Sequence, residues 1–330
     1  MAIRLGVIGL GIGEHHAREY LKLEGVQVVA VADIACERAQ QVARRYGIAH
    51  AYTSGPQMLG NEKLDAVSIC TTPRSHHELV LAAAEHGLHI LCEKPMAPSL
   101  AECDDMIAAC KRAGVTLLLG FKKRSSPAFR FLKDKEGEWG QPRIGQVRFQ
   151  LGPVPKQWFW DENDGGGPLI ENTAHAFDML RFLFGEAERV YAEGGSYFAD
   201  GRESISAAAC SLRFRSGSIA TLAAGAGGIW GYDASERWVL NYDTLNAELE
   251  GPFDVPRRLR LMRRDGQAVE ERWWQDASGW AEQMRHFLAC VRGEASPRAT
   301  GEDGKRALQL GLAVKQSVRE GRPITIDLGQ

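Results

Sequence analysis

Residues 3–13 read IRLGVIGLGIG, an apolar run that passes into three alternating glycines. The run predicts a buried strand, and the segment that follows, Glu14–Leu23, is typical of a helix. Gly9 allows a tight turn, and Gly11 lets the backbone approach a pyrophosphate at the positive end of the helix. A strand, a glycine turn and a helix in this order predict a dinucleotide-binding turn. Its residues are Gly9, Gly11, Ile12 and Gly13.

The next apolar run, Val26–Ala32, ends at Asp33, which lies 20 residues after Gly13. A carboxylate at this place accepts a hydrogen bond from the ribose 2′-hydroxyl of NAD and repels the 2′-phosphate of NADP. The sequence therefore favours NAD over NADP, and Arg38 is the residue that could reverse this preference. Asp33 could also be the N-cap of the following helix, Ala35–Tyr46, and the two roles are compatible.

Two later apolar runs end in turns that carry polar side chains. Leu64–Thr71 leads into Thr72-Pro73, and Ile90-Leu91-Cys92 leads into Glu93-Lys94-Pro95. Both runs are typical of buried parallel strands, and an open α/β sheet binds its ligands beyond the carboxyl ends of its strands. The sequence therefore places the ammonium group of Lys94 at that edge, on a turn stiffened by proline. A surface lysine before an ordinary loop proline is the alternative.

Helix signals separate these strands. Ser75-x-x-Glu78 and Ser99-x-x-Glu102 have the spacing of capping boxes, and the two helices that they open are predicted to end at Gly87 and at Ala113-Gly114. A further strand follows at Val115–Leu119. This alternation of strands and helices predicts a doubly wound parallel sheet within residues 1–120.

Two histidine doublets, His15-His16 and His76-His77, raise the question of a metal site. Neither doublet has the i, i+4 spacing of two helical ligands, and no His/Cys spacing resembles a zinc site, so we expect no metal. His76 and His77 are interpreted mainly as cap and packing residues. His77 remains a candidate for the cofactor site because it lies close to the predicted crevice.

After Gly120 the pattern changes to short strands separated by turn signals. The predicted strands are Gln146–Leu151, Val190–Phe198, Ala207–Phe214, Ser218–Ala224, Trp238–Asn241, Ala247–Glu250 and Arg258–Arg263. They indicate an α/β domain with an open, mostly antiparallel sheet. Two late helices are predicted at about Trp280–Arg292 and Glu302–Glu320. The change of pattern predicts two domains, residues 1–120 for the dinucleotide and 121–330 for substrate binding and oligomerisation. Because no linker-like segment occurs, we expect a compact junction between them near residue 120.

One segment of the second half, residues 164–185, reads DGGGPLIENTAHAFDMLRFLFG. Three glycines form a pliable loop, and Pro168 suits the first turn of a helix that ends at Gly185. Glu171, His175 and Asp178 fall at i, i+4 and i+7, on one face of this helix. A carboxylate one turn away can orient the imidazole and raise its proton affinity, so His175 could take a hydroxyl proton. A solvent-facing polar stripe is the alternative.

Composition excludes several classes of protein. The chain has 330 residues, 44% hydrophobic and 25% charged, with a net charge of −2. No basic stripe suggests nucleic acid, and no apolar run has the length of a membrane span or the features of a signal peptide. The seven cysteines form no CxxC pair. We therefore expect a cytoplasmic protein with reduced thiols.

Taken together, the glycine turn, Asp33, Thr72-Pro73 with His77, Glu93-Lys94-Pro95 and the helix with Glu171, His175 and Asp178 resemble the glucose–fructose oxidoreductase and inositol dehydrogenase family of NAD(P)-dependent enzymes. The resemblance covers essentially the whole chain. It implies a Rossmann domain, then a domain whose open sheet commonly forms a dimer or tetramer interface. It also implies that Lys94 contacts the reacting hydroxyl and that His175 is the acid/base. Two departures from the family pattern are the shortened glycine turn and Glu171, where inositol dehydrogenases usually have Asp, which argues against myo-inositol itself.

These observations predict an oxidoreductase that moves a hydride between nicotinamide and a carbinol of a cyclic polyol or sugar. Lys94 would polarise the carbinol oxygen, and His175, steered by Glu171, would remove its proton. The candidate cofactor-binding residues are Gly9, Gly11, Ile12, Gly13, Asp33, Thr71, Thr72, Pro73, His77, Glu93 and Lys94. The candidate substrate residues are Asp178, Trp158 and Trp160. Asp178 could instead hold a neighbouring site residue in place without touching the substrate. The two tryptophans, together with Phe159, could instead pack in the hydrophobic core.

Two alternatives remain from the sequence. One is an enzyme of the same fold that retains and recycles its nicotinamide, such as an isomerase, a hydrolase or a sugar–sugar oxidoreductase. The other is an NAD-binding regulator without catalysis. The identity of the sugar rests on loops of the second domain, such as residues 153–165 and 224–235, whose shapes the sequence does not predict.

Overall fold

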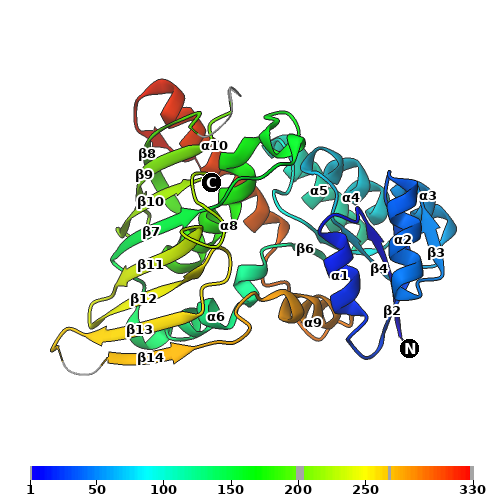
Figure 1. The fold of residues 1–330 in the computed structure, drawn as a ribbon, viewed down its shortest axis with the longest axis horizontal. Helices are drawn as coiled ribbons and strands as arrows, with labels where there is room; N and C mark the ends of the chain where they lie inside the picture. The colour runs from blue at the N-terminus through cyan, green and yellow to red at the C-terminus, as the bar shows by residue number, and fades with distance from the viewer. Residues whose placement is uncertain (1, 198–203, 267–268, 328–330) are drawn as a thin grey trace. The chain divides into compact units, whose positions relative to one another are not determined.

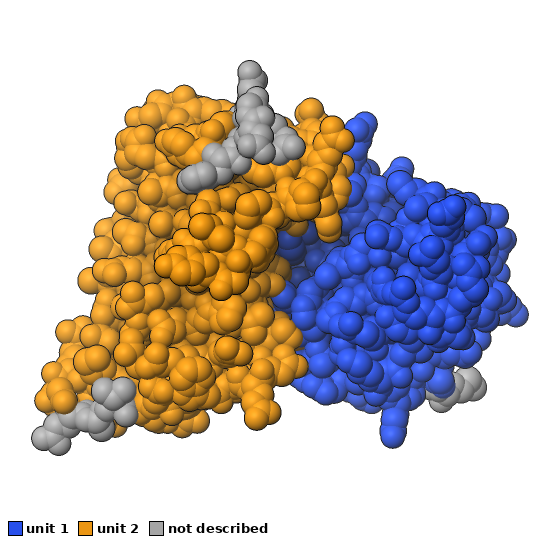
Figure 2. All heavy atoms as spheres, viewed as in Figure 1, with its two compact units in different colours: residues 1–122, 280–305 blue, residues 123–279, 306–330 orange. Residues whose placement is uncertain are grey.

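The computed structural model describes residues 2–197, 204–266 and 269–327, and the chain divides into two compact units (Figure 2). Unit 1 comprises residues 1–122 and 280–305, and unit 2 comprises residues 123–279 and 306–330. The first change of unit falls two residues from the boundary that the sequence predicts at residue 120. The return of residues 280–305 to unit 1 is not predicted, because the sequence interpretation assigns all of 121–330 to the second domain.

Unit 1 is built on a parallel sheet, which confirms the predicted doubly wound fold. Among the described residues this sheet has six strands in the order β3-β2-β1-β4-β5-β6. In chain order the elements are β1 (Ile3–Ile8), α1 (Gly13–Tyr20), β2 (Val26–Ala32), α2 (Cys36–Tyr46), β3 (His50–Tyr52), α3 (Gly55–Asn61), β4 (Ala66–Ile69), α4 (His76–Glu85), β5 (His89–Cys92), α5 (Leu100–Ala113), β6 (Leu117–Leu119) and, from the late segment, α9 (Trp280–Val291). The short edge strand β3 and helix α3 are not predicted, because neither carries a long apolar period.

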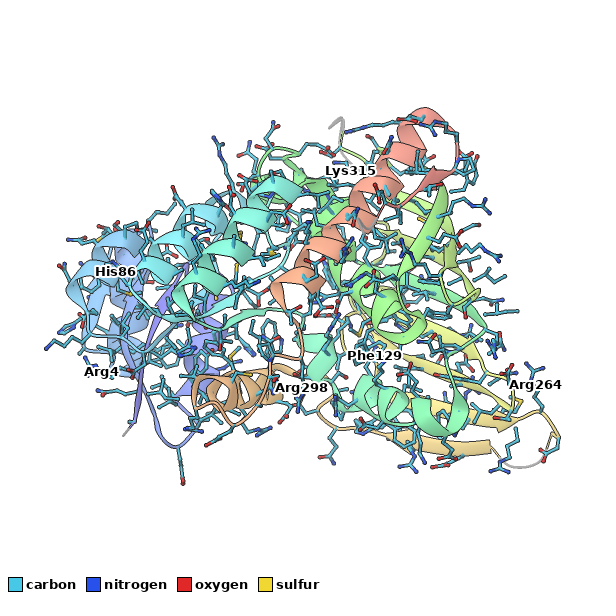
Figure 3. All side chains as sticks on the ribbon, turned by 180° about the vertical axis from the view of Figure 1, so that it is seen from behind. Arg4, His86, Phe129, Arg264, Arg298 and Lys315 are labelled. Atoms are coloured by element: carbon cyan, nitrogen blue, oxygen red, sulfur yellow. The ribbon has the colours of Figure 1, made fainter. Side chains whose placement is uncertain are left out.

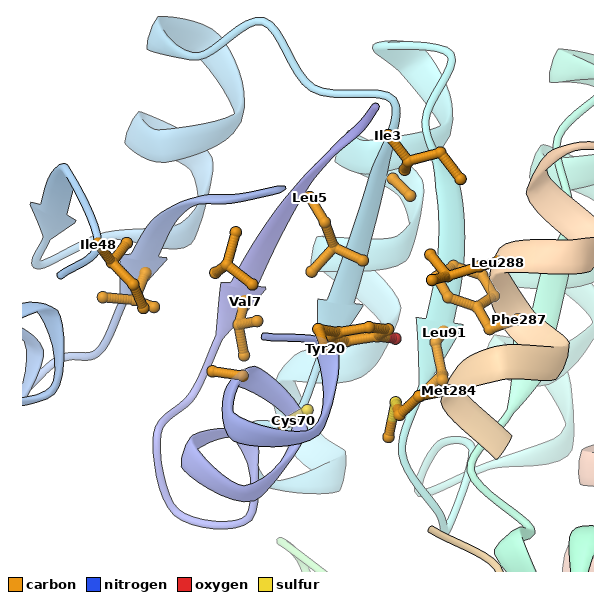
Figure 4. Packing of buried hydrophobic residues seen from close by; sticks show 14 of the residues in the cluster. Ile3, Leu5, Val7, Tyr20, Ile48, Cys70, Leu91, Met284, Phe287 and Leu288 are labelled. Carbon is orange, nitrogen blue, oxygen red and sulfur yellow. The ribbon is translucent and has the colours of Figure 1, made fainter. Parts of the chain in front are cut away.

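The two faces of this sheet are covered by different helices. Gly6 of β1 faces α3, where an added Cβ would lie 2.7 Å from the Cε atom of Met58. The neighbouring residues of β1 point to the opposite face, because side chains alternate along a strand. There they pack in one apolar cluster with α1, α2 and α9 (Figure 4). The cluster includes Leu5, Val7, Tyr20, Met284, Phe287 and Leu288.

Unit 2 is built on a larger sheet. Its strands, among the described residues, are nine in the order β14-β13-β12-β11-β7-β10-β9-β8-β15. Strands β7 and β10 pair in parallel and the other neighbours in antiparallel fashion, so the predicted open, mostly antiparallel sheet is confirmed. The strands are β7 (Ile144–Gln150), β8 (Ala187–Gly195), β9 (Ala207–Phe214), β10 (Ile219–Gly225), β11 (Ser235–Asn241), β12 (Leu245–Pro252), β13 (Arg258–Arg263), β14 (Val269–Trp273) and β15 (Ile324–Thr325). The last two are not predicted, and Phe198 of the predicted strand Val190–Phe198 lies outside the described residues.

Helices cover one face of this sheet. The helices of this part of the chain are α6 (Pro127–Asp134), α7 (Glu136–Trp139), α8 (Gly167–Phe184) and α10 (Gly301–Glu320), with 3-10 turns at Lys122–Ser125 and Gln157–Trp160. Helix α8 runs across this helix-covered face (Figure 1), where the ring of Phe184 stacks on Phe214 of β9 with centroids 4.9 Å apart. Burial alternates along β7, β9 and β10, so their other face is open.

The two predicted capping boxes have different outcomes. Ser99 caps α5 as predicted: its hydroxyl accepts from the N–H of Glu102 at 3.3 Å, and the Glu102 carboxylate accepts from the N–H of Ser99 at 3.0 Å. The box predicted at Ser75 and Glu78 is wrong. The Ser75 hydroxyl donates instead to the hydroxyl of Thr71 at 2.8 Å and so braces the preceding turn, and α4 begins at His76 with Ser75 as an N-cap residue that makes no side-chain cap.

Candidate active site

Strand register brings the predicted cofactor residues of unit 1 to one edge of the parallel sheet. Ile8 of β1 lies opposite Ala32 of β2 on one side and Ile69 of β4 on the other, and Ile69 lies opposite Cys92 of β5. All four strands therefore end at the same level. The turns that follow carry the glycines, Asp33, Thr71-Thr72-Pro73 and Glu93-Lys94.

The glycine turn has the shape that a dinucleotide needs. Gly9 adopts a φ of +83°, and an added Cβ there would lie 2.7 Å from the backbone nitrogen of Thr71, so another residue would not fit. Nothing lies within 4 Å of the place where a Cβ of Gly11 would stand. This space admits an approaching pyrophosphate, and α1 begins just beyond, at Gly13, with its positive end toward the turn.

Asp33 connects the glycine turn to the end of β2. Its Oδ2 atom accepts from the N–H of Leu10 at 2.7 Å, and its Oδ1 atom accepts from the N–H of Ala35 at 2.9 Å. The N-cap alternative is wrong, because α2 begins at Cys36 with Ala35 as its N-cap and no side-chain cap. A carboxylate offers about four acceptor positions, so Asp33 keeps capacity for a ribose hydroxyl while it holds the turn.

Glu93 lies beneath the turn that carries Lys94. The carboxylate is buried, where Oε1 lies 3.2 Å from Nε2 of His16 and Oε2 accepts from the N–H of Lys94 at 3.2 Å. Burial by itself raises the pKa of Glu93, but the hydrogen bond and charge of His16, with the charge of Lys94, outweigh it, and the net pKa is lowered. An added Cβ at Gly120 would lie 2.6 Å from Oε1, so a glycine there leaves room for the carboxylate. Glu93 therefore orients the Lys94 backbone from below.

The second histidine doublet splits between two environments. The buried ring of His76 lies between backbone carbonyl groups of the two turns, with Nε2 at 3.1 Å from the oxygen of Thr71 and Nδ1 at 3.0 Å from that of Pro95. His77, the candidate from the sequence, is instead paired with Asp105 of α5 at 3.4 Å. Among the described residues, no group of three or more His, Cys, Asp or Glu could hold a metal ion.

In unit 2, helix α8 begins in the predicted glycine loop. Gly166 is its N-cap with φ +78°, Gly167 has φ +75°, and the helix ends at Gly185 as predicted. Glu171 is partly exposed and His175 is buried one turn later, on the same helical face. A carboxylate and an imidazole at this spacing can act as an oriented acid/base pair.

Trp158 borders this part of α8. A Cβ at Gly165 would lie 3.6 Å from Cζ3 of Trp158 and 3.8 Å from Cβ of Glu171, so both side chains lie next to the glycine loop. Phe159 and Trp160 belong to a buried apolar cluster, against which the partly buried Trp158 packs, and the indole of Trp160 donates to the carbonyl of Val154 at 2.8 Å. Their environment favours the core alternative, whereas Trp158 stays a candidate for a substrate wall.

Asp178 is enclosed by arginine. Its carboxylate is fully buried and accepts from Nε of Arg124 at 2.9 Å and from Nη2 at 2.7 Å. Nη1 of Arg181 lies 3.6 Å away. This arrangement favours the supporting role weighed for Asp178 over direct contact with a substrate. Arg124 lies just after the first change of unit, among other basic residues. The sequence therefore gives no indication that this arginine is the one that pairs with Asp178.

An ion pair across the chain fixes the glycine loop. Lys315 of α10 (Figure 3) is buried, donates to the carbonyl of Gly166 at 3.0 Å and pairs with Glu162. Glu162 also stands 2.8 Å from the place where a Cβ of Gly167 would lie. No sequence signal identifies this contact, because 153 residues separate Lys315 from Glu162. Lys315 thus holds the N-terminus of the helix that carries Glu171 and His175.

The chain matches family models over both halves. Residues 3–121 match a model described as "Oxidoreductase family, NAD-binding Rossmann fold", and residues 135–240 match the GFO/IDH/MocA C-terminal domain. A D-apiose dehydrogenase of Paraburkholderia graminis is 30% identical, over 97% of this chain and 88% of its own. A myo-inositol 2-dehydrogenase of Thermotoga maritima is 29% identical, over 98% and 99%.

A solved structure agrees with these matches. The crystal structure of a probable dehydrogenase from Thermotoga maritima superposes with a TM-score of 0.83, at 28% identity, over 98% of this chain and 99% of the other. The sequence relatives, the fold and the dinucleotide turn therefore agree. The chain belongs to the GFO/IDH/MocA family of oxidoreductases, with an NAD-binding Rossmann domain.

Proposed function

We propose that this protein is an NAD-dependent dehydrogenase that oxidises a CH–OH group of a cyclic polyol, sugar or sugar derivative. The observation that carries the proposal is the placement of Glu171 and His175 on one face of α8, at the glycine loop. Lys94, on the turn at the ligand edge of the parallel sheet, supplies a cation for the carbinol oxygen. Relatives named for inositols and D-apiose support this substrate class.

The proposed chemistry divides among three side chains. Bound NAD⁺ supplies the acceptor for the hydride that leaves the carbinol carbon. Lys94 donates a hydrogen bond to the carbinol oxygen, which stabilises negative charge as the O–H bond breaks. His175 takes the hydroxyl proton, and Glu171, one turn away, orients the imidazole and stabilises the imidazolium that results. The reverse transfer of the same proton reduces a ketone.

The cofactor is proposed to be NAD rather than NADP. Asp33 already lies at the end of β2, where its charge would face the ribose and repel a 2′-phosphate. Arg38, the residue that could favour NADP, is exposed on α2. We expect a preference for NAD⁺ in kcat/KM, and Asp33→Ser is expected to reduce this preference. Because Asp33 also accepts from Leu10, the variant is compared by the ratio of the two cofactors rather than by rate alone.

Formation of NADH by the purified protein tests the proposal directly. The panel holds inositols, hexoses, pentoses and sugar acids, each with NAD⁺ and with NADP⁺. His175→Ala and Lys94→Ala are expected to bind NADH as the wild type does and to lower kcat by about 10²–10⁴-fold. Lys111→Ala, at an exposed lysine of α5, is the matched control. Full turnover in both active-site variants would refute the assignment of these residues.

The same measurement separates the alternatives. Cofactor that survives purification and dialysis, with isomerisation or exchange between two sugars, would indicate a recycled nicotinamide. Tight NAD binding with no turnover of any member of the panel would favour a regulator. Loss of the signal in Lys94→Ala would establish the dehydrogenase together with its substrate class.

We also propose that the protein is a homodimer or homotetramer joined through the open face of the unit 2 sheet. Ile144 of β7, Ile219 of β10 and Tyr191 of β8 are exposed on that face by 44%, 45% and 36%. Burial of these exposed apolar side chains against a second copy would remove them from water. Ile219→Asp is expected to give monomers in light scattering, whereas Ile34→Asp, at an exposed isoleucine of unit 1, is not. A wild-type monomer would refute this.

The proposed location is the cytoplasm. All seven cysteines are free thiols, and six of them are buried. This usage suits a reducing compartment. No helix in the described part of the chain is long and apolar enough to cross a bilayer. Fractionation of cells that express the tagged protein tests the location.

A further inference from the structure

The ring of His76 lies between the two turns that carry the proposed site. Its Nδ1 atom lies 3.0 Å from the carbonyl oxygen of Pro95 and 3.2 Å from that of Met96, both in the turn after β5. Its Nε2 atom lies 3.1 Å from the carbonyl oxygen of Thr71, in the turn after β4. The side chain is fully buried. One imidazole therefore contacts both turns at the ligand edge of the sheet.

The protonation of the ring decides which turn it holds. A neutral imidazole donates through one nitrogen only, while the lone pair of the other faces an acceptor. The imidazolium would donate to both turns, but burial lowers the pKa of His76, and the hydrogen bonds to the carbonyl groups and the charge of Glu93 do not offset it. His76 is also the first residue of α4, where the positive end of the helix disfavours a cation.

The Nδ1 side faces two carbonyl oxygens and the Nε2 side faces one. A proton on Nδ1 satisfies Pro95 and Met96 together and leaves one oxygen, that of Thr71, opposite a lone pair. A proton on Nε2 leaves two oxygens opposite a lone pair. Electrostatics therefore favours the Nδ1–H tautomer.

We propose that His76 is a positioning residue for Lys94. The Nδ1–H group of His76 donates to the carbonyl of Pro95 and so fixes the turn that presents the Lys94 ammonium group. This inference rests on the proposed function of Lys94. Pro95 is the residue directly after Lys94, so a shift of its carbonyl shifts the lysine backbone. Displacement of a reacting group by about 1 Å can lower a rate by about 10²-fold.

Two amide variants test which nitrogen acts. The amide nitrogen of Asn reaches the position of Nδ1, and that of Gln reaches the position of Nε2. His76→Asn is expected to keep kcat within a few-fold of wild type, whereas His76→Gln and His76→Ala are expected to lower kcat by about 10²-fold. NADH affinity is expected to stay near the wild-type value in His76→Asn and His76→Gln. His86→Asn and His86→Gln, at the exposed far end of α4 (Figure 3), are the matched controls.

The tautomer can be measured without any substrate. In protein labelled with ¹⁵N-histidine, the two ring nitrogens of a neutral imidazole differ widely in chemical shift, and the spectrum of His76→Asn identifies the His76 signals by their loss. The Nδ1–H tautomer at neutral pH supports the proposal. An Nε2–H tautomer or an imidazolium would overturn it, as would equal kcat in the Asn, Gln and Ala variants.

The two proposals fail in different ways. If wild-type protein oxidises no polyol or sugar, the proposed function fails, and the tautomer measurement still decides the state of His76. If wild type is active and Gln rescues the rate while Asn does not, the proposed function stands, and the assignment of His76 to the Lys94 turn is overturned in favour of the Thr71 turn. Thermal midpoints of all variants separate lost folding from lost positioning.

Discussion

Replacement of Asp178 by Asn tests whether this residue supports the fold or binds substrate. Asp178 is 0% exposed and Arg124 is 7% exposed, and the two form a bidentate pair. Asn removes the charge but keeps the size, so the Arg124 guanidinium stays buried without its counter-charge. Breaking a buried pair in this way costs about 3–5 kcal/mol. The ring of Phe182, 5.1 Å from the guanidinium, gives partial compensation, and we expect about 3 kcal/mol.

Urea unfolding followed by tryptophan fluorescence measures this loss. Of the eight tryptophans, all but Trp280 belong to unit 2, so the signal reports chiefly on that unit. The control is Asp243→Asn, which breaks another bidentate pair, that with Arg143, at the surface, where the side chains are 60% and 58% exposed. We expect no measurable shift in the control. An unchanged midpoint in Asp178→Asn, together with a raised KM for the substrate, would refute the supporting role and restore the substrate role.

Two further predictions concern the contacts that hold the site. The pKa of Glu93 is lowered from 4.5 in the folded protein. The carboxylate therefore contributes fully to stability above pH 4.5, and this contribution is lost as the pH falls through the lower folded pKa. Glu93→Gln should flatten the acid limb of the stability–pH profile, and an identical limb in both proteins would contradict this. Lys315→Met removes the donor to Gly166, a bond from a charged group worth about 1.5–3 kcal/mol, and should lower both the unfolding midpoint and kcat. Arg319→Met is its control, because Arg319 also reaches Glu162 but is 63% exposed; equal effects of the two substitutions would argue against a special role for Lys315.

The sequence predicts the parallel sheet and most of its ligand edge because each repeat of strand and helix carries a local signal. Glycines mark the turn after β1, and a proline follows each of β4 and β5 within a few residues. The same holds for α8, where Pro168 and Gly185 mark the ends and the polar period places Glu171 and His175 on one face. Each of these signals is local, because it depends on neighbouring residues or on the periodicity of a single element.

The rest of the site depends on contacts between distant residues. Glu93 meets His16 across 77 residues, and Arg124 meets Asp178 across 54. Nothing in the neighbourhood of either residue indicates its partner. The sequence does not separate the environments of His76 and His77, because adjacent residues of a helix point about 100° apart. His76 contacts the turns after β4 and β5, and His77 pairs with Asp105 of α5. Burial decides between them, and the sequence does not give it.

The division of unit 1 into two chain segments has a consequence for synthesis on the ribosome. Helix α9 supplies Met284, Phe287 and Leu288 to the cluster on β1, and it leaves the ribosome about 160 residues after residue 122. At about 5–20 residues per second, this interval lasts on the order of 10–30 s. During that time α1 and α2 can cover part of this face of the nascent sheet, but the side chains from α9 are missing. The apolar core of the dinucleotide-binding unit is therefore completed only when about the last sixth of the 330-residue chain emerges.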